Sequence, residues 1–448
     1  MNYSVIRRIL GKILILIALL MVFPLFVSIC YQESLRNILS FLIPIGLLLT
    51  IGSLLKIKTS KNTKISAREG IIIVGLTWLL LALFGCLPFI ISKEIPNFFN
   101  AFFEMTSGFT TTGASIVPDV TKLSHSMLFW RSFSHWIGGM GVLVFILAII
   151  PESKDGSSMH ILRAESPGPQ VGKIVSKMQV TSRILYLIYS CMTLIMIILL
   201  WLGPDTKMNF FKSVCYSLGT AGTGGFGLDP DSLSSYSAYS QYIIAIGMIL
   251  FGINFSLFYL ILIKNVKDVF KNEELRWYLA IVSVSIIVIF SSIYSTYKNI
   301  EITFRHSFFQ VASIISTTGY STTDFILWPT IAINIIAILM VSGGSAGSTA
   351  GGMKVTRINI LFKSAIRKIK NLVSPNKVET ITIDNKPVSD ATIESVQSFF
   401  IVYVFIFVLC ALIISIDNFD LTTNLSRQMP LVILSQPMYL IKAQSSAP

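Results

Sequence analysis

The segment SIISTTGYSTTDF, residues 313–325, places Thr, Ser and Gly side by side between long apolar stretches. The chain has 448 residues, of which 53% are hydrophobic and only 13% are charged. Soluble domains carry roughly twice that share of charged residues, so the composition indicates a membrane protein. At membrane depth, a polar and bendable segment is tolerated only where protein or a water-filled cavity surrounds it. Residues 313–325 are therefore predicted to line a pathway through the membrane.

Apolar runs of about 18 residues or more, long enough to cross a bilayer as helices, recur along the chain. They cover residues 13–30, 38–55, 71–92, 126–150, 184–203, 241–263, 277–296, 328–350 and 397–416. The first run follows Arg7, Arg8 and Lys12 but has no small-residue cleavage site after it, which favours an anchor over a removed signal peptide. The sequence thus predicts an all-α, multi-pass membrane protein.

Basic residues gather in four of the connecting segments, which are therefore predicted to face the cytoplasm. The clusters are Lys56, Lys58, Lys61, Lys64 and Arg68; Lys154, Arg163, Lys173, Lys177 and Arg183; Lys264, Lys267, Lys271 and Arg276; and Arg357, Lys363, Arg367, Lys368 and Lys370. The net charge of +13 is explained by this insertion signal and by contact with anionic membrane lipids, and no nucleic-acid partner is required. The five cysteines lie singly in apolar surroundings, which predicts neither a disulfide framework nor a metal site.

Three connectors on the opposite, outer side resemble one another. They read NAFFEMTSGFTTTGASIVPD (100–119), NFFKSVCYSLGTAGTGGFGLDPD (209–231) and RHSFFQVASIISTTGYSTTD (305–324). Each begins with an aromatic stretch that is long enough for about three turns of helix but too short to span the bilayer. Each continues with Thr and Gly and ends in acid. The pattern predicts a short helix that dips into the membrane and a non-helical strand that returns to the outer side.

These residue types suit a monovalent cation. Glycine lets successive carbonyl oxygens point to one side, threonine adds a hydroxyl oxygen, and such oxygens replace the hydration shell of the ion. The partially negative C-terminus of each short helix favours a cation as well. One copy alone is equally well explained as an external loop, whereas three copies favour a pore lining. The acidic residues that follow either concentrate cations or are solvated loop charges, and both interpretations stay open; they are Asp119, Asp229, Asp231 and Asp324.

Beyond this, the chain resembles the Trk/Ktr/HKT superfamily of potassium transporters, and most closely the bacterial Trk-type membrane subunit. The resemblance extends to about residue 424 and rests on SGFTTTGAS, FWRSFSHWIGGMGV (129–142), TAGTGGF, STTGYSTTDF and SGGSAGSTAGGMKVTRI (342–358). It implies four helix, pore-loop, helix repeats around one pore, each supplying one segment of a selectivity filter. It also implies a location in the cell inner (plasma) membrane, a homodimer, and a cytoplasmic ring of nucleotide-binding regulatory (TrkA-like) subunits.

The resemblance also assigns the residues that bind the ion. By position, K⁺ would bind in the filter formed by Thr111, Thr112, Gly113, Gly222, Thr223, Gly224, Gly225, Thr317, Thr318 and Gly319. Such a filter has one key glycine per repeat and is simpler than that of a true potassium channel. The resemblance therefore implies weaker discrimination of K⁺ from Na⁺, and Na⁺ stays a second candidate ion. No covalently bound cofactor is expected.

The run SGGSAGSTAGG, residues 342–352, holds five glycines, each of which costs a helix interior roughly 1 kcal/mol relative to Ala. The helix is therefore predicted to break. A phosphate cradle is disfavoured because Met353 separates Gly352 from Lys354, and close helix packing remains an alternative. The resemblance favours a third interpretation, an intramembrane gate below the filter. Its residues would be Gly343, Gly344, Ser345, Ala346, Gly347, Ser348, Thr349, Gly351 and Gly352.

The expected division of the chain follows the repeats, with the fourth incomplete. It runs 1–69 (two N-terminal helices), 70–150, 151–263 and 264–362 (pore repeats 1 to 3), 363–395 (cytoplasmic loop) and 396–448 (partial repeat 4 with an aberrant tail). After Asn424 the likeness stops, and no glycine occurs after Gly352, as a truncated gene would give.

The expected function is potassium uptake through a gated, channel-like pore. One alternative is a truncated, non-transporting remnant. Another is a Na⁺/H⁺-coupled K⁺ symporter, which is less favoured because the sequence places only the carboxylate of Glu104 near the pathway. No enzyme is predicted, since the four histidines are scattered and no nucleophile constellation occurs.

Overall fold

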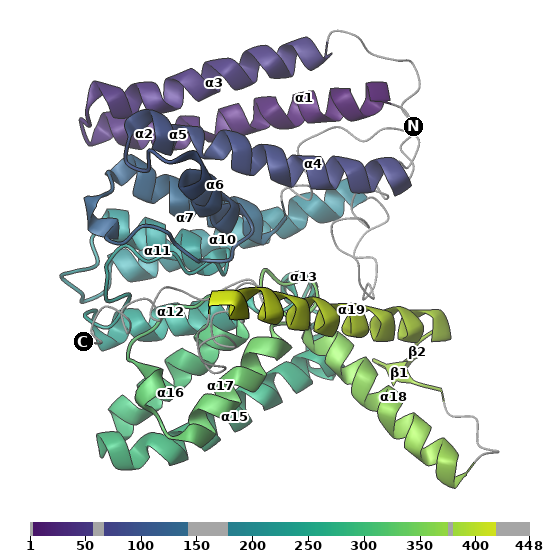
Figure 1. The fold of residues 1–448 in the computed structure, drawn as a ribbon. Coiled ribbons are helices and arrows are strands. Elements are labelled where there is room, and N and C mark those ends of the chain that lie inside the picture. Colours follow the sequence, from purple (N-terminus) through teal and green to yellow (C-terminus); the bar gives the residue numbers. More distant parts are fainter. Residues whose placement is uncertain (1–2, 57–66, 142–177, 375–379, 418–448) are drawn as a thin grey trace. The chain divides into compact units, whose positions relative to one another are not determined.

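The computed structural model describes residues 3–56, 67–141, 178–374 and 380–417, which are mostly helical (Figure 1). The chain forms two compact units. The first comprises Met1–Pro167, Lys173–Trp201 and Met208–Ser232, and the second Gly168–Gly172, Leu202–Lys207 and Leu233–Pro448. The predicted domain boundaries remain predictions.

The first unit contains the helices α1 (Tyr3–Leu20), α2 (Val22–Cys30), α3 (Leu35–Lys56), α4 (Ala67–Gly85), α5 (Leu87–Ser92), α6 (Phe98–Phe109), α7 (His125–Gly139), α10 (Met178–Trp201) and α11 (Phe210–Ala221). The second unit contains α12 (Ala238–Phe251), α13 (Phe255–Leu262), α14 (Val266–Lys271), α15 (Glu273–Tyr297), α16 (Ile300–Ile315), α17 (Thr330–Ser342), α18 (Val355–Val373), the two-residue strands β1 (Thr382–Ile383) and β2 (Lys386–Pro387), and α19 (Asp390–Ile414).

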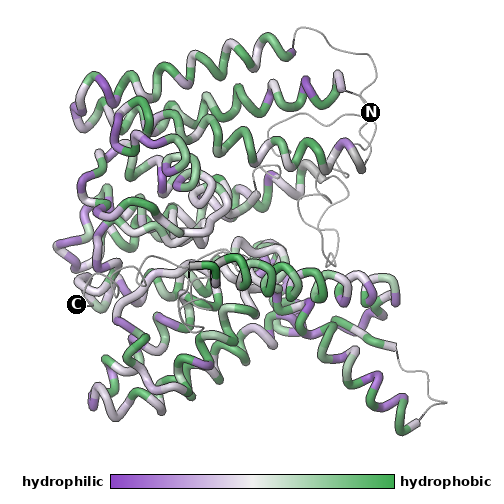
Figure 2. Tube along the Cα trace, in the orientation of Figure 1, coloured by the Kyte–Doolittle hydropathy of each residue, from purple (hydrophilic) through white to green (hydrophobic). Residues whose placement is uncertain are grey.

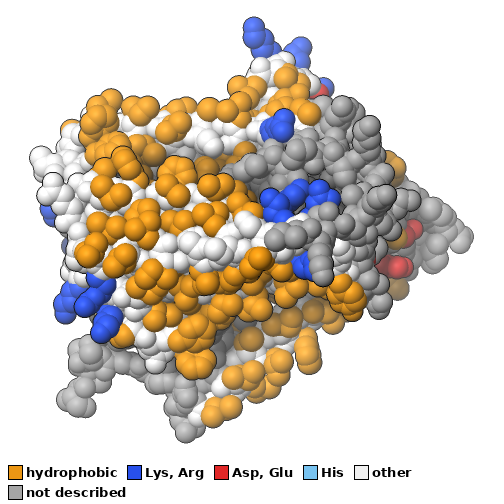
Figure 3. All heavy atoms as spheres, turned by 90° about the horizontal axis from the view of Figure 1, so that it is seen from above, with side chains coloured by type: hydrophobic (Ala, Val, Ile, Leu, Met, Phe, Trp, Pro, Cys, Tyr) orange, Lys and Arg blue, Asp and Glu red, His pale blue; other side chains and the backbone are white. Residues whose placement is uncertain are grey.

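Among the residues that the structure describes, six helical segments are long and apolar enough to cross a membrane. They are Tyr3–Cys30, Leu35–Lys56, Ile72–Ser92, Val180–Trp201, Glu273–Tyr297 and Asp390–Cys410. Hydrophobic residues run along these helices, and hydrophilic residues concentrate in the connections (Figure 2). The face shown in Figure 3 carries a broad layer of hydrophobic side chains with Lys and Arg gathered at its margins. Exposed apolar layers of this size suit a lipid environment, and the predicted all-α polytopic membrane fold is confirmed.

Three predicted spans differ in detail. The span predicted over 241–263 is not one continuous helix, because α12 and α13 meet at a 93° bend over residues 252–254. Asn254 starts the second half as an N-cap whose Oδ1 accepts the Ser256 N–H. The predicted span 328–350 ends as a helix at Ser342, where the glycine run begins. The span predicted over 126–150 begins as α7, and its residues 142–150 lie outside the described residues.

Small residues let helices of the first unit approach closely. A Cβ added to Gly11 of α1 would lie 2.8 Å from the Gly52 carbonyl oxygen of α3. The N-terminal end of α7 is tied down by two carboxylates: Glu33 accepts the N–H and hydroxyl of Ser126, and Glu94 accepts those of Ser124. α7 is thus held in a fixed position beside the short helices α6 and α11.

In the second unit, α15, α16 and α17 share an apolar core that includes Ile289, Ile314 and Ile336. The hairpin of β1 and β2 turns at Asp384 and Asn385, which both have positive φ, as two-residue hairpins require. The Asp384 carboxylate accepts the N–H of Glu273 and so joins the hairpin to the start of α15.

Candidate functional site

Three short helices lead into the three Thr/Gly segments. They are α6, α11 and α16, with 12, 12 and 16 residues. Each begins at an asparagine whose side chain accepts backbone N–H groups of the first turn, namely Asn97, Asn209 and Asn299. Each helix therefore starts at a fixed residue and ends directly before its Thr/Gly segment. Segment 1 comprises residues 111–113, segment 2 residues 223–225 and segment 3 residues 317–319.

The backbone of all three segments has the same unusual conformation. The first residue of each is a threonine with positive φ, of 56° at Thr111, 52° at Thr223 and 59° at Thr317. The third residue is a glycine with positive φ, of 75° at Gly113, 83° at Gly225 and 89° at Gly319. Positive φ is unusual for a β-branched residue and costs of order 1–3 kcal/mol, so strain of this kind points to function.

The same hydrogen bond fixes the middle of each segment. The N–H of Thr112 donates to the Ser107 carbonyl, that of Gly224 to Gly219, and that of Thr318 to Ser313, each at 2.9 Å. Within a trans peptide the C=O points opposite to the N–H. The carbonyl oxygens of the three leading threonines, Thr111, Thr223 and Thr317, are therefore directed away from the helix that precedes them. Three segments thus present uncharged oxygens in the same way.

Segments 1 and 2, which both belong to the first unit, lie against each other. A Cβ added to Gly113 would lie 2.1 Å from the Gly224 carbonyl oxygen. The end of α7 lies close to the residues that precede both segments: a Cβ on Gly138 would be 1.9 Å from the Phe109 carbonyl oxygen, and one on Gly139 would be 2.6 Å from Gly222 Cα. Gly222 is the C-cap of α11, lies one residue before segment 2 and has a helical φ. It packs against α7, where a Cβ would lie 2.2 Å from the His135 carbonyl oxygen.

Segment 3 lies in the second unit and contacts the glycine loop, residues 343–352. The N–H of Gly351 donates to Thr317 Oγ1 at 2.6 Å. The two ends of the loop are paired with each other, because Lys354 N–H donates to the Ser342 carbonyl and Val355 N–H to that of Gly344, both at 3.0 Å. The predicted break of this helix is therefore present, as a closed loop between α17 and α18.

The glycine loop is packed too tightly for larger residues. A Cβ on Gly343, where φ is +67°, would lie 2.2 Å from the Gly351 carbonyl oxygen, and one on Gly352 would lie 2.6 Å from Gly343 Cα. Ser348 Oγ donates to the Ser345 carbonyl at 2.6 Å within the loop. The glycines of this loop thus pack closely against one another, and the alternative of close helix packing stays a prediction.

The glycine loop docks on the break between α12 and α13. Ser345 N–H donates to the Gly252 carbonyl at 3.0 Å, Thr349 Oγ1 donates to that of Phe251 at 3.1 Å, and Phe255 N–H donates to that of Gly347 at 3.0 Å. A broken helix leaves backbone groups without their intrahelical partners, and in a membrane these must be satisfied within the protein. Here the backbone groups left open by the two helix breaks form hydrogen bonds with each other.

A buried carboxylate holds the same loop from the other side. Glu274, on the first turn of α15, is 2% exposed. Its Oε1 accepts the N–H of Ala346 at 2.6 Å and the hydroxyl of Thr356 on α18. One side chain therefore joins the loop to the helix that follows it.

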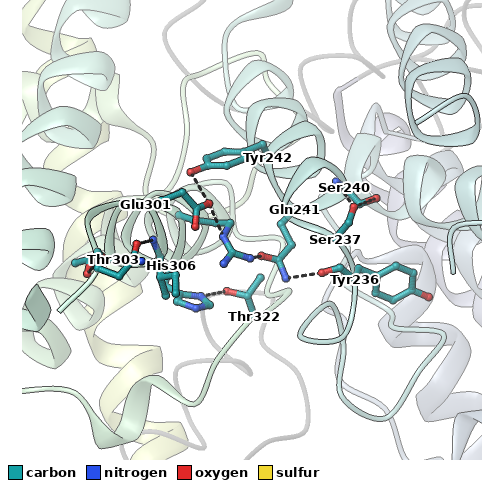
Figure 4. Close-up of polar contacts among 12 residues, drawn as sticks. Tyr236, Ser237, Ser240, Gln241, Tyr242, Glu301, Thr303, His306 and Thr322 are labelled. Carbon is teal, nitrogen blue, oxygen red and sulfur yellow. Dashed lines mark hydrogen bonds and ion pairs between the residues drawn. The ribbon is translucent and has the colours of Figure 1, made fainter. Parts of the chain in front are cut away.

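Hydrogen bonds also hold the residues around segment 3 (Figure 4). His306 Nδ1 lies 2.8 Å from the Thr322 hydroxyl, which links α16 to the chain leaving segment 3. Arg305 donates to Gln241 Oε1 at 2.7 Å, and Gln241 Nε2 donates to the Leu233 carbonyl at 2.8 Å.

The acidic residues after the glycines have local structural roles. Asp119 accepts the N–H and hydroxyl of Thr121, which lowers the pKa of its exposed carboxyl. Asp324 caps the next turn through the Ile326 N–H, and Asp229 pairs with Lys212 at 2.9 Å. Caps and an ion pair were not among the roles that the sequence suggested for them.

Sequence reasoning missed two charged residues of this region. Arg131 on α7 forms a buried ion pair with Glu104 on α6, with 2.7 Å between Nε and Oε1. Glu274 lies 72 positions from Ala346, which it holds. Arg131 falls within a quoted motif, but neither residue stands in a periodic pattern with its partner, so only the fold reveals the contacts.

Comparison with known proteins gives consistent results. The family model described as "Cation transport protein" (TrkH) matches residues 36–427. The chain is 34% identical over 432 residues to the Trk system potassium uptake protein TrkH of Escherichia coli K12, covering 94% of this chain and 88% of that protein. It is 30% identical over 429 residues to the TrkG protein of the same strain, covering 94% and 87%. The crystal structure of the potassium transporter TrkH from Vibrio parahaemolyticus superposes with a TM-score of 0.86 at 28% identity, covering 97% of this chain and 90% of that one.

Proposed function

We propose that this chain, which belongs to the TrkH family of cation transport proteins, is the pore-forming subunit of a potassium uptake system. It is a multi-pass protein of the inner membrane, and family membership agrees with the prediction of a transporter instead of an enzyme. The observation that carries the proposal is the backbone conformation that segments 1 to 3 have in common. Each presents a threonine and a glycine at positive φ directly after a short helix.

The three segments act as a selectivity filter. Their carbonyl oxygens replace the water around K⁺, and no charged group is needed to hold the ion, so that it can leave again. The C-terminal ends of α6, α11 and α16 add partial negative charge where each segment begins. A membrane potential of about 100 mV contributes roughly 2.3 kcal/mol per charge, which drives uptake without a coupled ion.

The glycine loop acts as the gate. Its link to Thr317 puts it against segment 3, so an ion leaving that segment meets the loop next. Backbone hydrogen bonds, Glu274 and the α12–α13 break hold it in place. For the gate to open, the loop must exchange these hydrogen bonds for others. It would then have two discrete arrangements, one closed and one open.

A cytoplasmic regulator moves the gate by acting on α18, which directly follows the glycine loop. This helix carries Arg357, Lys363, Arg367, Lys368 and Lys370, a basic surface suited to a nucleotide-binding, TrkA-like partner. The relatives are named as parts of a Trk system, which fits an assembly of several components. A homodimer of the membrane subunit is part of the same proposal.

Proton-coupled symport has less support. A coupling carboxylate must exchange its proton during the cycle, whereas Glu104 is fully buried and engaged by Arg131, Ser115 and the Ile116 N–H. The alternative of a truncated remnant depends on residues 418–448, which lie outside the described residues.

Potassium flux into vesicles tests the proposal. Purified chain is reconstituted in liposomes, and uptake of K⁺, Na⁺ or choline is followed under an imposed inside-negative potential. The expected result is potential-driven K⁺ uptake that exceeds Na⁺ uptake and is absent for choline. Equal rates for all three cations, or no uptake above empty liposomes, would contradict it.

A further inference from the structure

The guanidinium of Arg131 lies between the supports of two filter segments. The residue is 1% exposed and lies in the middle of α7. Its Nε donates to Glu104 Oε1 at 2.7 Å, and its NH2 group donates to Ser115 Oγ at 3.1 Å. On another side, its Cζ lies 4.1 Å from the ring centroid of Phe226.

The first set of contacts holds segment 1. Ser115 follows Gly113 closely in the chain, and its hydroxyl also donates to Glu104 at 2.9 Å. The Ile116 N–H donates to the other oxygen of Glu104, again at 2.9 Å. The chain that leaves segment 1 is thus tied back to α6 by a carboxylate that Arg131 neutralises and orients.

The second set of contacts holds segment 2. Phe226 directly follows Gly225, the last residue of that segment, and is 2% exposed. Its ring contacts both the guanidinium of Arg131 and the imidazole of His135, and the centroids of the Phe226 and His135 rings are 4.2 Å apart. Because the backbones at Gly113 and Gly224 touch, a shift of either support moves one segment against the other.

An ion pair is not required for packing at the position that Glu104 occupies. At the position that Glu104 occupies relative to its filter glycine, the other two short helices carry Tyr216 and Gln310. Both are buried and neither is charged. Burying two charges is expensive, and well-packed apolar replacements are often at least as stable. The pair in the first repeat therefore calls for a role other than stability.

We propose that Arg131 is a positioning residue that sets the spacing of segments 1 and 2 and thereby the preference of the filter for K⁺ over Na⁺. The inference rests on the proposed function, because it assigns a role within that filter. Arg131 does not touch the ion. It acts through Glu104 and Ser115 on one segment and through Phe226 on the other.

Two conservative variants separate these links. Arg131→Lys keeps the charge but loses the planar fork, so it cannot hold Glu104, Ser115 and the ring at once. Phe226→Leu keeps the ion pair and removes the ring. Each is expected to lower the ratio of K⁺ to Na⁺ uptake by about tenfold, which corresponds to about 1.4 kcal/mol. The double variant Glu104→Gln/Arg131→Met, which leaves no unpaired buried charge, is expected to behave in the same way.

Glu94→Gln is the matched control. It also removes a carboxylate that binds a serine, but this one is half-buried and lies at the N-terminus of α7, so the change is expected to lower thermal stability and leave the uptake ratio unchanged. A wild-type uptake ratio in whichever of the three variants fold would overturn the inference and leave Arg131 a structural role only.

A binding readout distinguishes this inference from the proposed function. Thermal unfolding of the purified chain is measured against K⁺ and Na⁺ concentration, since a ligand stabilises the state that binds it. If the wild-type chain carries no flux but K⁺ protects it better than Na⁺, the transport proposal fails, and the variants still decide the role of Arg131 through this preference. If neither flux nor preferential protection is seen, both proposals fail.

Discussion

Single residues set the conformation of the proposed filter. Gly113, Gly225 and Gly319 have φ between 75° and 89°, where a side chain is strained whatever the space around it. The threonine at the start of each segment also has a strained, positive φ, and its side chain supplies a hydroxyl group. Within segment 3, for example, the Thr317 hydroxyl receives a hydrogen bond from the glycine loop.

Gly113→Ala tests this conformation. The new methyl group would overlap the Gly224 carbonyl oxygen at 2.1 Å and add positive-φ strain. We expect K⁺ flux to fall about tenfold or more, because strain of about 1–2 kcal/mol alone corresponds to that order. Gly46→Ala is the control, since a Cβ there meets nothing within 4 Å and Ala favours the helix. Equal flux in both variants and the wild type would speak against a filter at segment 1.

Asp205 gives a prediction for pH. It lies after α10, outside the spans, and accepts the Ser240 hydroxyl and the N–H groups of Ser237 and Lys207. Burial raises the pKa of its carboxyl, but these hydrogen bonds outweigh burial, so the pKa lies below its usual 3.8. A folded-state pKa below the unfolded one stabilises the fold above the unfolded pKa, and this contribution is lost as the pH falls through the folded pKa.

The wild-type protein should therefore unfold at a higher temperature than Asp205→Asn at pH 7. The difference should shrink as the pH is lowered from about 5 toward about 2. Thermal unfolding followed by circular dichroism in detergent measures it. A difference that stays constant over this range would show that the carboxylate contributes no pH-dependent stability.

At the scale of elements, two broken helices form one assembly. The glycine loop that separates α17 from α18 satisfies the backbone groups left open where α12 gives way to α13. Movement of the loop must therefore be accompanied by a change at residues 251–255. The proposed gate thus involves the second pore repeat as well as the third.

Glu274→Ala should loosen this assembly. It removes the buried carboxylate that accepts the half-buried Ala346 N–H, which costs about 1–3 kcal/mol in stability. K⁺ flux without a regulator should rise, because the closed loop loses a support. Glu273→Gln is the matched control, since the neighbouring carboxylate pairs with Lys363 and Asn359 of α18 instead of the loop. An increase of the same size in the control would mean that the loop is not specifically involved.

Shortening the glycine loop is the more direct test of its role. Deletion of residues 346–349 removes the contacts to Glu274, Asn254 and Phe251 while leaving the paired ends at Ser342 and Lys354. Flux in liposomes should rise and lose its response to an added cytoplasmic regulator. Flux that is no higher and just as regulated would exclude the loop as the gate.

For the whole molecule, the features that could be predicted from the sequence are those that depend on residues close together in the chain. Spans follow from length and apolarity, and the break after Ser342 follows from five glycines in eleven residues. The bend at residues 252–254 could not be predicted in this way, because one glycine and one asparagine in an apolar run cost little, and the groups that satisfy the break lie about a hundred positions away.

Long-range pairs escaped sequence reasoning for a related reason. Glu104 and Arg131 are 27 positions apart, and Glu274 and Ala346 are 72 apart, so neither pair leaves a periodic signal. The predicted departure in the fourth repeat falls on residues 418–448, outside the described residues. The candidate filter and gate were predictable as motifs, whereas their supports were visible only in the fold.

The central claim is that segments 1, 2 and 3 surround one ion. Anomalous diffraction from crystals grown with Rb⁺ or Tl⁺, which replace K⁺, locates that ion directly. The account predicts a peak bounded by backbone oxygens of residues 111–113, 223–225 and 317–319, and its loss when Na⁺ replaces the heavier ion. A peak remote from these oxygens, or three segments that do not face a common axis, would contradict it.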